Sequence, residues 1–95
     1  MTYDLKFLPS ALKEWKKLGA TVKDQFKKKL EERMGEPEVP ADRLRGHKNF
    51  YKIKLRSSGY RLVYEVEKEE ITIYVIAVGK RENKSVYRNA DKRKR

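Results

Sequence analysis

The segment YKIKLRSSGYRLVYEV at residues 51–66 decides the fold, because it has the pattern of two strands joined by a tight turn. Apolar and charged residues alternate with a period of two on both sides of Ser57-Ser58-Gly59. This alternation is typical of a β-hairpin that buries one face and leaves the other free. We therefore expect strands over 51–56 and 60–67.

The hairpin also predicts which side chains share a face. A loop of two or four residues pairs the apolar faces and places Ile53 opposite Leu62 or Tyr64. That register puts Lys54 on the same face as Arg61, with Lys52 beside them. These three cations should line the solvent face of the hairpin.

Strand patterns also lie at both ends of the chain. Residues 71–78 form a nearly continuous apolar, β-branched run, which indicates a central strand that ends at Gly79. Near the N-terminus, Tyr3, Leu5 and Phe7 alternate with charged residues and predict a short strand closed by Pro9.

Two helices are expected between the first strand and the hairpin. Ser10 is predicted to cap the first helix and Gly19 to end it, with apolar residues at helical spacing at Ala11, Leu12, Trp15 and Leu18. Thr21 and Asp24 resemble a capping box for the second helix. Its apolar face comprises Val22, Phe26, Leu30 and Met34, and it ends at Gly35 and Pro37. The short link between the helices predicts an antiparallel helical hairpin.

The C-terminal segment 83–93 is polar and predicts a short, loosely held helix, followed by a basic tail, Lys92 to Arg95. The expected order is thus β-α-α-β-β-β with a C-terminal helix. Such an order indicates one α+β domain over residues 1–95, with the helical hairpin packed on one face of a mostly antiparallel sheet.

The net positive charge of the chain indicates which kinds of molecule it binds. The 95 residues carry a net charge of +11, and residues 48–95 hold 14 Lys and Arg against six Asp and Glu. Such a basic domain is the electrostatic footprint of a nucleic-acid-binding protein. No long basic amphipathic helix, membrane-spanning run or signal peptide is visible, so we expect a cytoplasmic protein without membrane contact.

The hairpin cations are the first candidates for a functional site. A solvated basic face is the ordinary interpretation of such residues on a half-buried sheet. However, like charges directly across a strand pair are destabilising, and Glu65 and Glu67 lie toward the far end of the strand. An uncompensated cluster of this kind favours an anionic ligand, and a phosphodiester backbone is the natural candidate.

Further candidates follow the last strand. Lys80 and Arg81 come directly after it, and Tyr87 is an aromatic residue that could stack on an unpaired base or simply pack on the sheet. The chain has no cysteine and one histidine, His47, and no His, Asp or Glu set has metal-ligand spacing. We therefore expect no metal and no cofactor.

The segments that contain these residues resemble those of a known protein family. The hairpin segment, with RLRG (43–46) before it, VGKRENKSVY (78–87) after it and ALKEWKKLG (11–19) in the first helix, closely resembles the RelE toxins of toxin–antitoxin pairs. The resemblance implies a microbial-ribonuclease-like fold. It also implies a metal-independent endoribonuclease that cleaves mRNA in the A site of a translating ribosome.

The resemblance also implies residue roles, because the family's catalytic residues match Lys52, Lys54, Arg61, Arg81 and Tyr87. Arg45 matches a basic residue linked to ribosome contact, and Arg56 and Lys80 are expected to bind RNA or ribosome. A free lysine, with a pKa of about 10.4, is a poor base, but neighbouring cations disfavour its charged form. Lys54 is accordingly assigned as general base, with Lys52 the alternative.

Arg61 and Lys52 would then hold the phosphate, Arg81 would stabilise or protonate the leaving oxygen, and Tyr87 would orient a base. The implied partners are a RelB-like antitoxin, the translating ribosome and its rRNA, with DNA reached only through the antitoxin. The alternative function is a non-catalytic, basic RNA- or ribosome-binding module, which overall charge fits equally well.

Overall fold

The structure, a computed structural model, describes residues 2–83 and 85–93. Four strands and three α-helices follow one another along the chain, with one-turn 3-10 helices at Pro40–Asp42 and Arg81–Asn83. The elements are β1 (Asp4–Phe7), α1 (Pro9–Lys16), α2 (Ala20–Gly35), β2 (Phe50–Leu55), β3 (Tyr60–Glu67), β4 (Thr72–Lys80) and α3 (Ser85–Lys92). The predicted order of elements is confirmed.

The strands form one sheet in the order β1-β4-β3-β2. β1 runs parallel to β4, and the pairs β3–β4 and β2–β3 are antiparallel. The sheet is therefore mostly antiparallel, as predicted, and β4 and β3 form its centre.

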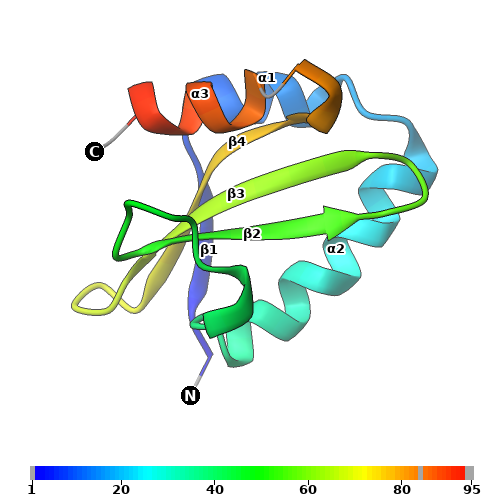
Figure 1. Ribbon diagram of the computed structural model, residues 1–95. Helices are drawn as coiled ribbons and strands as arrows, with labels where there is room; N and C mark the ends of the chain where they lie inside the picture. The colour runs from blue at the N-terminus through cyan, green and yellow to red at the C-terminus, as the bar shows by residue number, and fades with distance from the viewer. Residues whose placement is uncertain (1, 84, 94–95) are drawn as a thin grey trace.

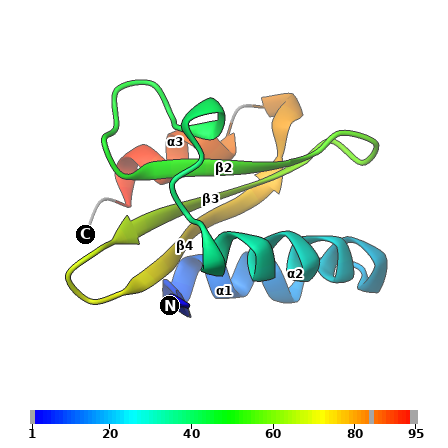
Figure 2. The same ribbon diagram turned by 90° about the horizontal axis from the view of Figure 1, so that it is seen from below.

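Helices cover both faces of the sheet. α1 and α2 lie on one face, and α3 lies on the other (Figures 1 and 2). Two hydrophobic clusters correspond to these layers. Ala11, Leu18, Phe26 and Leu30 bring α1 and α2 onto the first face, whereas Val86 and Ala90 of α3 pack onto the second.

The hairpin has one of the two predicted registers. Ile53 pairs with Leu62 and Lys54 with Arg61, so residues 56–59 form a four-residue loop. Gly59 has a φ of 76°, which lies in the left-handed region and explains why glycine occupies that position.

β4 is apolar on nearly every residue because both of its faces are covered, and a β-bulge interrupts its alternation. Val63 pairs with Ala77 and Tyr64 with Val75, so that Ile76 is an extra residue in the ladder. Ile76 and Ala77 consequently both face α3, and strict alternation is interrupted there.

The predicted helix caps are wrong, although the helices themselves are confirmed. α1 begins at Pro9, not after Ser10, because proline at the first helical position needs no hydrogen-bond partner for its nitrogen. Gly19 does not end α1 in the left-handed conformation; it is the extended N-cap residue of α2. Neither helix receives a side-chain capping bond, so Thr21 and Asp24 form no capping box.

None of the helices in residues 2–83 and 85–93 is long and apolar enough to cross a membrane. Of the predicted basic tail, Lys92 belongs to α3 and Arg93 follows it, and the last two residues lie outside the described part of the chain.

Candidate active site and nucleic-acid interface

A row of cations crosses the hairpin on the side that faces α3. Lys52 and Lys54 alternate along β2 with the buried Ile53 and Leu55, and both lysines remain partly exposed. Lys54 lies directly across from Arg61. Among the described residues, no ion pair joins any of these three side chains to a carboxylate.

Arg61 differs from the prediction, because it does not lie on a solvent face. Only 6% of its surface is exposed, and one guanidinium nitrogen donates to the Tyr60 carbonyl at 2.9 Å. The reason is the position of α3: Arg61 pairs with Gly79 of β4, and a Cβ on Gly79 would lie 3.6 Å from the Cβ of Val86. Arg61 is therefore a buried cation directly across the strand pair from the partly exposed Lys54.

Arg81 lies at the same end of the hairpin. It opens the 3-10 turn after β4, its side chain is exposed, and its main-chain N–H donates to the Gly59 carbonyl at 2.9 Å. A cavity of about 430 Å³ lies beside it, lined by Ser58, Gly59, Lys80, Arg81 and Glu82. The loop 56–59 thus brings Arg56 and Arg81 near the Lys54–Arg61 pair.

Tyr87 packs on the sheet, as one of the two interpretations expected, and its stacking on a base stays a prediction. It lies in the first turns of α3 and packs, half-buried, against the cluster that includes Phe50, Val63 and Val86. The residue as a whole is partly exposed, so packing in this cluster does not bury it completely.

The described residues contain no group of three or more His, Asp or Glu side chains that could hold a metal ion. His47 instead stacks on Phe50, with ring centroids 4.5 Å apart, and its Nε2 lies 2.5 Å from Asp91 of α3. The single histidine therefore connects the loop before β2 to the C-terminal helix.

Comparison with known proteins decides the family. Residues 5–84 match the model of the ParE toxin of type II toxin–antitoxin systems. The mRNA interferase toxin RelE of Escherichia coli (strain K12) is 57% identical over 93 residues, 98% of either chain. The chain belongs to the RelE/ParE family of type II toxins.

Solved structures agree with this assignment. A free E. coli RelE carrying two arginine-to-alanine substitutions superposes on the toxin with a TM-score of 0.91, at 56% identity over 98% of both chains. RelE in the intact E. coli RelBE toxin–antitoxin complex gives a TM-score of 0.82 at 57% identity, covering 84% of this chain and 98% of that one.

Two of the predicted RNA-binding residues lie apart from the cation row of the toxin. Lys80 sits on the opposite face of β4, where its Nζ lies 5.5 Å from the centre of the Tyr60 ring. Arg45 is exposed in the loop before β2, beside a cavity of about 600 Å³ lined by Pro40, Arg43, Leu44, Arg45, Gly46, His47 and Lys48. The toxin thus spreads positive charge along the whole length of β2.

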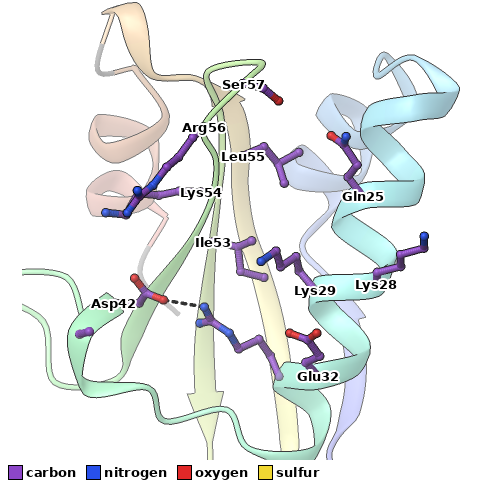
Figure 3. A pocket seen from close by; sticks show the side chains of 12 residues that line it. Gln25, Lys28, Lys29, Glu32, Asp42, Ile53, Lys54, Leu55, Arg56 and Ser57 are labelled. Atoms are coloured by element: carbon purple, nitrogen blue, oxygen red, sulfur yellow. Dashed lines mark hydrogen bonds and ion pairs between the residues drawn. The ribbon is translucent and has the colours of Figure 1, made fainter.

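A groove of about 810 Å³ runs between α2 and the free edge of β2. Figure 3 shows Lys29 pointing across it toward Ile53, whereas Lys54 and Arg56 extend from β2 to the side away from α2. Five cations and two carboxylates line this groove, namely Lys28, Lys29, Arg33, Lys54, Arg56, Glu32 and Asp42. The edge of the sheet therefore presents positive charge on both sides of the strand.

Arg33 is a positioning residue that the sequence did not reveal. Its guanidinium donates to the Tyr64 hydroxyl at 2.8 Å and to the Lys52 carbonyl at 3.4 Å. It also pairs with Asp42 at 2.5 Å, the contact that the dashed line on Asp42 marks in Figure 3. It therefore joins α2 to β3 and to the 3-10 turn before β2, with a weaker contact to the β2 backbone at Lys52. In the sequence it is one of many cations in a charged helix, and only the contacts distinguish it.

Proposed function

We propose that the toxin is a ribosome-dependent endoribonuclease that cleaves mRNA in the ribosomal A site and so inhibits translation. The observation that supports this proposal most strongly is the direct cross-strand pairing of Lys54 with Arg61. Arg81 lies next to the loop that joins these two strands. Its support is the identity of 57% to a protein named mRNA interferase toxin RelE.

The arrangement suits attack of the RNA 2′-hydroxyl on the adjacent phosphate. Lys54 would accept the 2′-hydroxyl proton, because it lies directly across from Arg61, which would hold the adjacent phosphate. Lys52 and Arg61 would stabilise the charge that develops on the phosphorane. The products are a 2′,3′-cyclic phosphate and a 5′-hydroxyl.

Arg81 and Tyr87 would complete the site. Arg81, exposed at the end of β4, would stabilise or protonate the departing 5′-oxygen, and Tyr87 would stack on or orient a base. Such acid–base groups are weak, so the rate depends on substrate geometry. A codon held rigidly in the A site supplies that geometry.

The proposed partners follow from charge and family. A RelB-like antitoxin neutralises the toxin, as supported by the E. coli RelBE complex, and Arg45 and Arg56 contact ribosomal RNA. The proposed location is the cytoplasm, where translating ribosomes are found.

The test uses purified toxin, translating ribosomes and an end-labelled mRNA. We expect cleavage in the A-site codon with a cyclic phosphate upstream, and unchanged activity after EDTA treatment with free magnesium restored. Binding without cleavage would favour the non-catalytic RNA-binding module. Activity lost to EDTA under these conditions would contradict the metal-independent mechanism.

Arg81→Ala gives a sharper test within the same assay. We expect the single-turnover rate to fall about 10²–10³-fold, as when one donor to developing charge is removed, with little change in ribosome affinity. Arg88→Ala is the matched control, since Arg88 is an exposed cation on α3. Equal losses in rate and affinity would make Arg81 an anchoring residue instead.

A further inference from the structure

Within the described part of the chain, about half of the outer edge of β4 has no neighbouring strand. β4 runs from Thr72 to Lys80, but the four-residue β1 pairs only with Thr72–Val75. Beyond this point the main-chain groups of β4 need other partners, because an unpaired buried N–H or C=O is costly.

An ion pair takes the place of the missing strand. The Glu14 carboxylate, from α1, accepts the Val78 N–H at 3.0 Å, and the Arg93 guanidinium donates to the Ile76 carbonyl at 3.1 Å. Glu14 and Arg93 also bind each other through two contacts, of 2.9 and 3.1 Å. α1 and α3 both lie beside β4 (Figure 1), so the pair joins the layers on the two faces of the sheet around the edge of this strand.

This pair has the properties of a strong contact. Its geometry is bidentate, and the side chains of Arg93 and Glu14 are only 21% and 25% exposed. Asn89, one turn before Arg93, adds a weaker contact to the same carboxylate at 3.5 Å. A partly desolvated, two-point arginine–carboxylate pair restricts orientation far better than a single exposed one.

The contacts on α3 fall on three sides of the helix. Val86 and Ala90 are buried against the sheet, Asn89 and Arg93 reach Glu14, and Asp91 reaches His47 near β2. Tyr87 precedes Asp91 by four residues and therefore shares its flank. Glu14 and His47 thus hold α3 from opposite sides, and a rotation of the helix would move Tyr87.

We infer that Glu14 is a positioning residue of the active site: through Arg93 and Asn89 it fixes the rotation of α3 and so holds Tyr87 toward the lysines of β2. This inference rests on the proposed function insofar as Tyr87 contacts substrate. The attachment of α3 to Glu14 does not depend on that function and is measured separately.

The first measurement is amide hydrogen exchange in the free toxin. Glu14→Gln keeps the shape of the side chain and removes its charge, so we expect faster exchange over residues 85–93. Glu31→Gln, at an exposed position of α2, is the matched control and should leave this segment unchanged. Unchanged protection in Glu14→Gln would overturn the attachment. Arg93→Lys, which keeps the charge but loses the two-point contact, tests the same pair if Glu14→Gln does not fold.

The second measurement is a double-mutant cycle on the single-turnover rate at saturating ribosomes. We expect Glu14→Gln to lower the rate about tenfold in the parent toxin and to have little further effect in the Tyr87→Ala background. A loss of similar size in both backgrounds would make the role of Glu14 merely structural and overturn positioning. Full activity of Tyr87→Ala alone would instead refute the proposed role of Tyr87 and, with it, the positioning role of Glu14, while the exchange result for α3 would stand.

Discussion

Tyr64 is the largest fully buried side chain, and its hydroxyl group joins three segments of the toxin. It donates to the Pro37 carbonyl at 2.7 Å and accepts from Arg33. Burial raises the pKa of Tyr64 to about 12, against the opposing effect of the Arg33 guanidinium. Because an unfolded tyrosine has a pKa of about 10, the native state retains this proton more strongly.

The resulting stabilisation is complete below pH 10 and is lost as the pH rises from 10 toward 12. We expect the difference in unfolding free energy between the toxin and Tyr64→Phe to shrink by about 2 kcal/mol between pH 9 and pH 12. Urea unfolding followed by circular dichroism measures it. Tyr3→Phe, at a half-buried position just before β1, is the control. A pH-independent difference would show that the Tyr64 hydroxyl does not titrate as described.

For single residues, the sequence predicted which side chains pair across the strands better than it predicted which side chains are buried. The Lys54–Arg61 pairing followed from alternation, because a one-residue slip would turn the apolar face outward. The burial of Arg61 depends on where α3 docks, and the role of Arg33 depends on contacts from four segments. Neither leaves a periodic signal in a chain with 25 Lys and Arg residues.

Among the elements, α3 was the hardest to assess from the sequence. A loosely held helix was expected because the segment is polar. The structure buries its two apolar residues, Val86 and Ala90, and adds polar contacts at Asn89, Asp91 and Arg93. Their partners, Glu14 and His47, lie 40 or more residues away in the chain. Helix positions were predictable from apolar spacing, but their first residues depended on local competition between Pro9, Ser10 and Gly19.

We expect the antitoxin to displace α3 and thereby remove Tyr87 from the site. An antitoxin helix with a larger apolar face would bury more apolar area on this surface than α3 does through Val86 and Ala90, and would therefore bind it more strongly. Hydrogen exchange should then show faster exchange over 85–93 in the complex, with β3 still protected as the internal control. Equal protection of this segment with and without antitoxin would favour direct occlusion of the cation row.

For the molecule as a whole, charge should set the rate of encounter. The net charge is +11, and its larger share lies in residues 48–95, which contain the hairpin and α3. We expect the association rate with translating ribosomes to fall at least about tenfold between 50 and 300 mM salt, while dissociation changes less. Stopped-flow fluorescence measures both rates. Lys28→Ala with Lys29→Ala should flatten the salt dependence more than Lys13→Ala with Lys17→Ala, and a salt-independent rate would contradict the charge argument.

Because β1 is short, it leaves part of the β4 edge uncovered, and this affects whether the toxin self-associates in solution. Once α3 leaves, Arg93 no longer covers the Ile76 carbonyl, and an apolar strand edge faces solvent beside Ile76 and Ala77. An exposed edge of this kind is a template for pairing with another chain. Toxin without its C-terminal helix should therefore precipitate or self-associate at concentrations where the intact chain stays monomeric. A partner that removes the helix has to cover that edge as well, which is a reason for an antitoxin to remain bound to its toxin.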